Sequence, residues 1–290
     1  MNAVFLLNTG YLIPLLGFGT YQITGPEKIY NVLDYALNAG YRHIDSAIVY
    51  RNEADIGNAL KTLLPKYNLK REDIFITSKI VPSSKHSEQD VENLVKDSLR
   101  NLQTNYIDLY LIHWPGASGL QPGDPKNKVQ RLLTWNILTK LKKEGHLRST
   151  GVSNFLVKHL EELVDDPKYE APAVNQVEWH PQNHNSTLLD YCREKGIFLQ
   201  AYSSLGTSGS STLREDSTVR QIAQKLGKSP SQVLLRWAYQ QNIGILPKAS
   251  SRTHIEENID LDFVIPDEDM KTLSDLKVKQ KFAWDPTVVA

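Results

Sequence analysis

The sequence predicts an α/β fold in which eight parallel strands close into a barrel and helices cover its outside. Short apolar runs alternate with helical patterns along nearly all of the 290 residues. The runs are almost continuously apolar, which is typical of parallel strands that are buried on both faces. Eight is also the number of strands that closes a barrel whose interior side chains can fill. We therefore expect a (β/α)8 TIM barrel, with a doubly wound open sheet as the alternative.

The first residues are expected to form a β-hairpin that closes the bottom of the barrel. Asn8-Thr9-Gly10 separates the apolar runs Phe5-Leu6-Leu7 and Tyr11-Leu12-Ile13, so the hairpin spans residues 1–14. The eight barrel strands are expected at Leu15 to Phe18, His43 to Asp45, Ile74 to Lys79, Tyr106 to His113, Ser149 to Ser153, Ala173 to Val177, Phe198 to Tyr202, and Gly244 to Pro247.

Helices are expected between the strands, where apolar residues recur every three or four positions. Gly40 and Gly196 stand just past two of these patterns, where a left-handed residue ends a helix without strain. No linker divides the chain, so residues 1–290 are predicted to be one domain with a C-terminal helix and tail over residues 260–290. The other helices are expected at Pro26 to Asn38, Glu53 to Leu64, Ser87 to Leu102, Lys128 to Lys143, Leu156 to Val164, Ser186 to Glu194, and Ser217 to Leu226.

Composition and charge exclude several classes of function. Basic and acidic residues each total 33, so no electrostatic argument favours nucleic acid or an anionic membrane as a partner. Cys192 is the only cysteine, which rules out an internal disulfide and a cysteine-built metal cluster, and the isolated His180 and His184 do not make a metal site. The apolar run at residues 4–7 is too short for a signal peptide or a membrane span. We expect a cytoplasmic monomer without a metal.

Chemically versatile residues stand where the expected strands end. In a barrel of this kind, active sites lie at the carboxyl ends of the strands. A polar residue at the end of one strand could occur by chance. Polar residues at the ends of seven successive strands indicate a functional site. The residues concerned are Asp45, Lys79, His113, Ser153, Asn154, Gln176, Tyr202 and Lys248.

Tyr50, Lys79, Asp45 and His113 are the types of residue that donate a proton to a carbonyl oxygen acquiring negative charge. The Lys79 ammonium is expected to lower the pKa of the Tyr50 phenol from its ordinary value of about 10. Asp45 is expected to keep that buried ammonium charged, and His113 to orient the substrate oxygen. The alternatives are a structural Asp45–Lys79 ion pair, a surface tyrosine and a capped histidine.

The chain resembles the aldo-keto reductase superfamily from the hairpin to about Asn258. The resemblance implies an (α/β)8 barrel that reduces aldehydes and ketones to alcohols with NADPH. In it, Tyr50 is the general acid, Lys79 and Asp45 tune its acidity, and His113 orients the carbonyl. The motifs that carry the resemblance are Gly40 to Tyr50 with Asn52-Glu53, Leu111-Ile112-His113-Trp114-Pro115, Gly151-Val152-Ser153-Asn154-Phe155 and Leu246-Pro247-Lys248.

The same resemblance implies a cofactor site along the strand ends. Asp45 borders the nicotinamide ribose, Tyr202 stacks on the nicotinamide, and the loop Gly206 to Ser211 folds over the pyrophosphate. No Rossmann GxGxxG is present, because Gly17-Phe18-Gly19-Thr20 lacks the third glycine. Asn154 and Gln176 are alternatively helix caps or strand-end hydrogen bonders. The implied cofactor residues are Gly19, Thr20, Tyr21, Asp45, Ser153, Asn154, Gln176, Tyr202, Ser203, Leu205, Lys248, Ser250, His254, Glu257 and Asn258.

The adenosine end departs from the family pattern. Lys248 is present, but Ala249 replaces a hydroxyl residue, and His254 stands where an arginine usually grips the 2′-phosphate. A neutral histidine offers one hydrogen bond where arginine offers a charged, bidentate grip. Arg252, two residues earlier, could bind the 2′-phosphate in place of that arginine if its side chain reaches it from the turn. We expect NADPH with a weaker preference than is usual, and NADH is the alternative.

The substrate is expected to be a small carbonyl compound, such as an aromatic or aliphatic aldehyde, a dicarbonyl or a ketone. By the resemblance, the pocket is apolar and aromatic with a polar floor. Its expected lining is Tyr21, Ile48, Val49, Tyr50, His113, Trp114 and Trp284.

Two other functions compete with this reading. A non-catalytic or regulatory NADPH-binding barrel subunit has no physical need for the acid Tyr50. A lyase or isomerase acting on a phosphorylated substrate needs a phosphate loop after strands seven and eight. That region contains residues 203–211 and Lys248, which the resemblance already assigns to binding of the dinucleotide.

Overall fold

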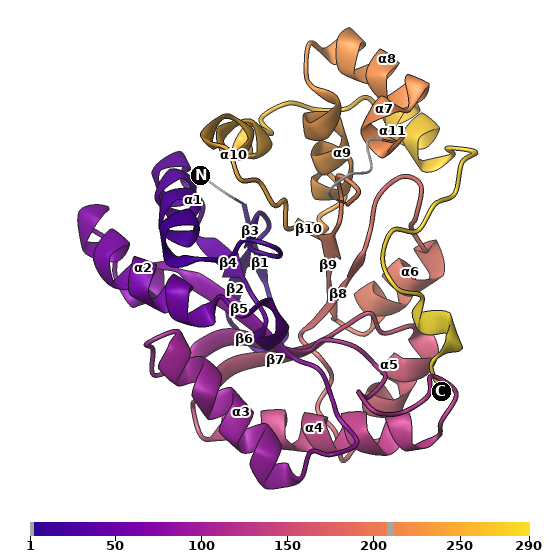
Figure 1. Cartoon of the computed structure of the whole chain (residues 1–290). Coiled ribbons are helices and arrows are strands. Elements are labelled where there is room, and N and C mark those ends of the chain that lie inside the picture. The colour runs from indigo at the N-terminus through magenta and orange to yellow at the C-terminus, as the bar shows by residue number, and fades with distance from the viewer. Residues whose placement is uncertain (1–2, 208–211) are drawn as a thin grey trace.

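The structure is a computed structural model that describes residues 3–207 and 212–290. Eight parallel strands follow one another around a sheet in chain order, with helices on the outside (Figure 1). The strands are β3 (Phe18–Gly19), β4 (His43–Asp45), β5 (Phe75–Ile80), β6 (Ile107–Ile112), β7 (Leu147–Ser153), β8 (Val174–Glu178), β9 (Phe198–Tyr202) and β10 (Gly244–Ile245).

Hydrogen bonds join the first strand region to the last, which closes the sheet. Leu16 pairs with Ile245 in a parallel bridge. The Ile245 amide donates to Leu15 at 2.7 Å, and the Gly19 amide donates to Pro247 at 3.0 Å. The predicted barrel is therefore confirmed, and the open sheet is wrong.

The N-terminal hairpin covers the amino ends of the barrel strands. β1 (Val4–Leu6) and β2 (Leu12–Pro14) pair antiparallel. The Phe5 ring stacks on Phe198, the first residue of β9, at 4.5 Å, and the Thr9 hydroxyl lies 2.7 Å from that of Ser149 in β7. These contacts place the hairpin at the end of the barrel opposite the predicted site.

The seven helices expected from periodicity are present, with boundaries shifted by at most two residues. They pack their apolar faces on the strands, as Ile29, Val32 and Leu33 do from the first helix. The helices are α1 (Pro26–Ala39), α2 (Glu53–Lys66), α3 (Glu88–Asn101), α4 (Lys126–Lys143), α5 (Val157–Val164), α6 (Ser186–Glu194), α7 (Thr212–Glu215), α8 (Ser217–Leu226), α9 (Pro230–Tyr239), α10 (Arg252–Ile259) and α11 (Asp267–Ser274).

The helix α9 was missed by the periodicity because its run of buried residues, Val233 to Leu235 with Trp237 and Ala238, is nearly continuous. A capping signal was nevertheless present: the Ser229 hydroxyl accepts from the Gln232 amide, and Pro230 begins the helix. After α11, the chain runs as an irregular tail past α6 and α5 (yellow in Figure 1). No helix in the described ranges has the length and hydropathy needed to cross a membrane.

Candidate active site

Two neighbouring strand ends bring Asp45, Tyr50 and Lys79 together. Asp45 ends β4, Lys79 lies one residue before the end of β5, and Tyr50 ends a short 3₁₀ helix, Ile48–Tyr50, that follows β4. The Lys79 side chain is fully buried, and its ammonium donates to Asp45 Oδ1 at 2.5 Å and to the Ser46 carbonyl at 2.9 Å. The same nitrogen lies 3.5 Å from the Tyr50 hydroxyl. The ammonium therefore links the carboxylate to the phenol.

His113 completes the group predicted from sequence. It follows β6 directly, and its ring meets the Tyr50 ring edge-on with 5.7 Å between centroids. Tyr21 is a second aromatic neighbour of Tyr50, with 5.1 Å between the centroids of these two rings. Burial lowers the pKa of His113 to about 3, with the Lys79 charge acting in the same direction. The imidazole is thus neutral near pH 7 and offers one N–H donor.

The pKa of Tyr50 corrects the expectation drawn from sequence. Burial raises this pKa well above its ordinary value, and the nearby Asp45 charge raises it further. Burial also lowers the pKa of Lys79, against the opposing effect of Asp45. Because the Asp45 carboxylate bonds directly to the ammonium, the phenol meets an ion pair and not an isolated positive charge. Tyr50 is held as a neutral phenol in this state.

Gln176 and Gln200 extend the group across the barrel interior. The Gln176 amide nitrogen donates to Asp45 Oδ2 at 2.8 Å and to Gln200 Oε1 at 2.9 Å. Gln176 thus holds the second carboxylate oxygen of Asp45. Gln200 was not predicted. Its signal in the sequence was its place two residues before Tyr202 in β9, which puts both side chains on one face of the strand.

Asn154 and Tyr202 form a second polar group at the strand ends. The Tyr202 hydroxyl donates to Asn154 Oδ1 at 2.6 Å, and the Asn154 amide nitrogen donates to the His113 carbonyl at 3.0 Å. The same nitrogen lies 3.1 Å from the hydroxyl of Ser153, which itself donates to the Gln176 carbonyl at 2.7 Å. Hydrogen bonds therefore join all five residues of this edge.

Left-handed backbone marks the rim of this region. Gln22, Arg51, Asn154 and Ser203 have φ values of 62°, 56°, 64° and 52°. Each directly follows a predicted site residue, namely Tyr21, Tyr50, Ser153 and Tyr202. Non-glycine residues rarely adopt this conformation, which is found where surrounding structure imposes it at binding sites. Asn154 and Ser203 directly follow β7 and β9, and Gln22 and Arg51 lie in the loops after β3 and β4.

Several predicted cofactor residues lie in the same region. Thr20 is fully buried and its hydroxyl donates to the Asp45 carbonyl at 2.8 Å, so it supports the site from beneath. At Gly19, an added Cβ would lie 3.0 Å from the Leu246 carbonyl oxygen. Leu205 packs on the core, and Ser203 is half-buried. The predicted pyrophosphate loop, 206–211, lies partly outside the described residues.

The predicted adenosine residues lie on and before α10. Lys248 is half-buried, whereas Ser250 and His254 are exposed. Arg252 donates to Glu256 at 2.7 Å and lies near Asp34 of α1. The predicted adenine residues follow in the same helix: Asn258 is buried, and the Glu257 carboxylate accepts from the Ser229 hydroxyl.

Predicted substrate residues stand around the Tyr50 ring and on the tail. Tyr21 and Val49 are exposed by more than half, and Ile48 is half-buried. Trp114 meets Trp284 edge-on with 6.1 Å between centroids, and Trp284 is 81% exposed. The two tryptophans therefore form one aromatic corner made from a loop and the tail.

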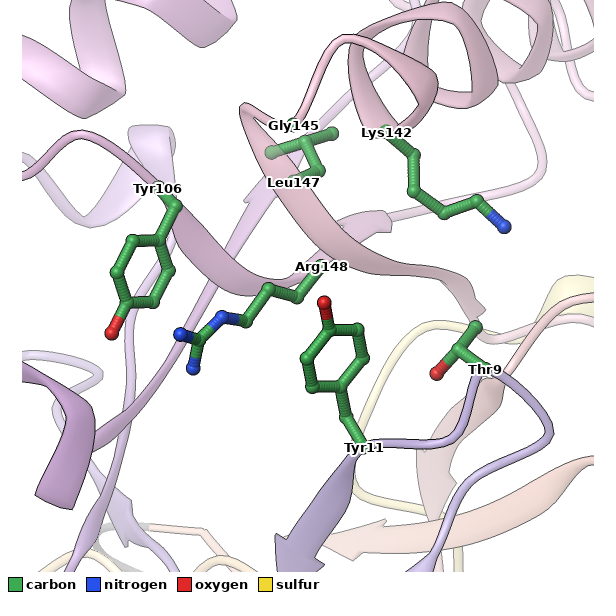
Figure 2. A pocket seen from close by; sticks show the side chains of 7 residues that line it. All are labelled: Thr9, Tyr11, Tyr106, Lys142, Gly145, Leu147 and Arg148. Atoms are coloured by element: carbon green, nitrogen blue, oxygen red, sulfur yellow. The ribbon is translucent and has the colours of Figure 1, made fainter.

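Two cavities in the described part of the chain lie apart from this site. One of about 380 Å³ is next to the hairpin, where the Arg148 side chain points between Tyr11 and Tyr106 (Figure 2). Its cations are already paired, Arg148 with Asp108 at 3.1 Å and Lys142 with Glu170. A second cavity, of about 460 Å³, is lined by residues from α2 and the segment after α3. Neither is lined by the four proposed catalytic residues.

Comparisons with known proteins find relatives over nearly the whole chain. The model of the Aldo/keto reductase family matches residues 15–277. Aldo-keto reductase family 1 member A1-A of Danio rerio is 37% identical over 307 residues, covering 100% of this chain and 94% of that protein. D/L-glyceraldehyde reductase of Hypocrea jecorina is 39% identical over 297 residues, covering 95% and 88% respectively. The crystal structure of an aldo-keto reductase enzyme from a Medee basin deep-sea metagenome library matches with a TM-score of 0.87, at 34% identity and over 98% of each chain.

Proposed function

This chain belongs to the aldo/keto reductase family, and we propose that it reduces aldehydes and ketones with NADPH, using Tyr50 as the proton donor. As a member of this family the protein is an oxidoreductase of carbonyl compounds. The observation that carries the proposal for Tyr50 is the buried Lys79 ammonium, which lies 2.5 Å from Asp45 and 3.5 Å from the phenol oxygen. This contact gives the phenolate a cation beside it once the proton has left.

The residues divide the chemistry between them. The carbonyl oxygen accepts hydrogen bonds from Tyr50 and from the neutral His113 ring. When bound, NADPH supplies the hydride that adds to the carbonyl carbon. As the carbonyl π electrons move to the oxygen, Tyr50 transfers its proton there and an alcohol forms. The resulting phenolate is stabilised by Lys79 and regains a proton before the next turnover.

The raised pKa of Tyr50 suits this role. A phenol that keeps its proton through neutral pH is always ready to donate, and an alkoxide is basic enough to take the proton. The buried surroundings also strengthen the two hydrogen bonds at the moment when charge develops on the oxygen. Asp45, held by Gln176 on its second oxygen, keeps the ammonium aimed at the phenol.

The donor set at the strand ends fits a dinucleotide. Ser153, Asn154 and Gln176 would hold the carboxamide with amide and hydroxyl groups, and the half-exposed Tyr202 ring would stack on the nicotinamide. The Ser204 hydroxyl, next to the predicted pyrophosphate residues Ser203 and Leu205, is buried without a partner among the described residues. The residues proposed to lie along the ribose are Gly19, Thr20, Tyr21 and Asp45. Those proposed to contact the adenosine are Lys248, Ser250, His254, Glu257 and Asn258.

The preference for NADPH over NADH is proposed to be modest. Lys248 makes no hydrogen bond or ion pair within the described part of the chain, so its charge is available to a 2′-phosphate. His254 stands where an arginine would give a charged, bidentate grip, and Arg252 is engaged with Glu256. The substrate is proposed to be a small carbonyl compound bound against Tyr21, Ile48, Trp114 and Trp284. We also propose a single-domain, cytoplasmic monomer.

The oxidation of NADPH and of NADH, followed with a panel of small aldehydes, tests the proposal. Turnover that is present in the intact protein and lost in Tyr50→Phe supports both the reaction and its acid. Tight cofactor binding with no turnover of any aldehyde would favour the regulatory subunit instead. Failure to bind either cofactor would contradict both readings.

A further inference from the structure

Glu178 has a fully buried carboxylate that plays no part in the chemistry described above. It ends β8, two residues beyond Gln176 and on the same face of the strand. Its side chain is 0% exposed. Oε1 accepts from His180 Nε2 at 3.0 Å and from the Phe282 amide at 2.6 Å. Oε2 accepts from the Ala283 amide at 2.9 Å and from the Lys281 ammonium at 3.0 Å.

Three of these four donors belong to the C-terminal tail. Two successive amides of the tail, those of Phe282 and Ala283, therefore grip one carboxylate, and the His180 ring packs against Phe282 with 5.1 Å between centroids. The donors hold the pKa of Glu178 at about 2, in spite of burial, which acts to raise it. The carboxylate is thus charged at every physiological pH.

A second anchor holds the far end of the tail. Lys158 donates to the Val289 carbonyl at 2.6 Å, and Arg131 donates to the Ala290 main-chain oxygen at 2.6 Å. The Ala290 amide donates to Pro122 at 2.9 Å. Between the anchors the chain spans residues 284–288, and Trp284 is the first residue after the Glu178 contacts.

We propose that Glu178 is a positioning residue that fixes the tail so that Trp284 stands against Trp114 as a wall of the substrate site. The inference rests on the proposed function of that site. It adds which residue holds the tail that carries Trp284. Trp284 has little contact of its own, as its 81% exposure shows. Its position is therefore set by the main chain at Ala283, one residue away, and that main chain is set by Glu178.

Glu178→Gln separates this role from simple packing because it keeps the size of the side chain. The amide cannot accept from all four donors, since its nitrogen is itself a donor that faces two N–H groups. The ion pair with Lys281 is lost as well. The tail is expected to detach at residues 281–283 while the strand β8 stays in place.

Limited trypsin digestion measures the attachment without relying on activity. Lys277, Lys279 and Lys281 are exposed in the tail, and the contact of Lys281 with Glu178 is expected to slow cleavage there in the native protein. Cleavage between residues 277 and 282, identified by the mass of the released peptide, is expected to accelerate at least five-fold in Glu178→Gln. Glu92→Gln, which removes a surface carboxylate that pairs with Lys96 and Lys140, is the matched control and should cleave at the native rate.

Steady-state kinetics then tests the action through Trp284. In Glu178→Gln, the KM for an aromatic aldehyde such as 4-nitrobenzaldehyde is expected to rise at least five-fold. The KM for propanal, the kcat and the NADPH dissociation constant should change less than two-fold. In a Trp284→Ala background, the same substitution should no longer change the KM for the aromatic aldehyde.

The outcomes separate the two proposals. Native cleavage rates in Glu178→Gln, or an equal rise in KM with and without Trp284, would overturn the role of Glu178. Absence of any carbonyl reduction by the native protein would contradict the proposed function, while the digestion would still decide whether Glu178 holds the tail. If Glu178→Gln does not fold, Lys281→Met removes one arm of the contact and should accelerate cleavage at Lys277 and Lys279 by a smaller factor.

Discussion

The ammonium of Lys79 lies 2.5 Å from Asp45 Oδ1, and both side chains are almost completely excluded from water. Removing two charges from water is unfavourable, so such a pair is retained where its charge is used or where its geometry is well satisfied. Here both conditions hold, because Ser46 and Gln176 complete the hydrogen bonds and Tyr50 lies within reach of the ammonium. The pair thus places its ammonium beside the phenol in a region from which water is largely excluded.

Lys79→Met is expected to abolish turnover and to destabilise the fold. It leaves the Asp45 carboxylate buried without its partner, a change that typically costs about 3–5 kcal/mol. Thermal or urea unfolding measures the loss, and aldehyde-dependent NADPH oxidation measures the activity. The double variant Lys79→Met/Asp45→Asn should recover much of the stability and remain inactive. Recovery of activity in the double variant would show that the pair is purely structural.

Tyr50→Phe is expected to lower kcat/KM for aldehydes by a factor of about 10² to 10⁴, the usual contribution of a general acid. The ring is kept, so its contacts with Tyr21 and His113 should persist. The NADPH dissociation constant, followed by fluorescence titration, should change less than two-fold. An active Tyr50→Phe protein would assign the proton to another donor.

The rate of reduction is expected to be nearly independent of pH between about 5 and 9. The pKa of Tyr50 is raised above its ordinary value of about 10, so the phenol keeps its proton throughout this range. The pKa of His113 is lowered to about 3, so the ring stays neutral. A profile of kcat/KM against pH checks this. A decline with a midpoint near pH 8 would show that the bound cofactor or substrate lowers the pKa of Tyr50.

The fold and the residues at the strand ends were predictable because strand burial and strand-end polarity are local properties of the sequence. The sign of the Tyr50 pKa shift was not, because it depends on how Asp45, Lys79 and burial combine in space. Gln200 was overlooked because the sequence gives no reason to place an amide within an apolar strand. That reason is its hydrogen bond with Gln176, which only the structure shows. Glu178 was overlooked for the same reason, since its donors Lys281, Phe282 and Ala283 are more than one hundred residues away in the chain.

His254→Arg is expected to tighten NADPH relative to NADH by roughly ten-fold, as a charged hydrogen bond to a phosphate does. His254 is the third residue of α10 and is exposed, so an arginine can be accommodated there without disturbing the core. The ratio of the two dissociation constants is the measurement. Arg252→Ala is the control, and it should leave the native ratio unchanged because Arg252 is paired with Glu256. An unchanged ratio in His254→Arg, together with a reduced ratio in Arg252→Ala, would assign the phosphate to Arg252.

The free energy of unfolding is expected to fall as the pH drops below about 6.5, the ordinary pKa of histidine. Burial lowers the pKa of His43 and His113 to about 3 and that of His159 to about 4. Between those values and 6.5, the unfolded chain binds protons that the folded chain does not, so acidification favours unfolding by up to about 1.4 kcal/mol per pH unit for each such histidine. Urea unfolding at pH 7, 6 and 5 measures the slope. His159→Gln keeps a donor for Val289, which lies 3.2 Å from Nε2, and should reduce the slope, whereas an undiminished slope would assign the proton uptake to other groups.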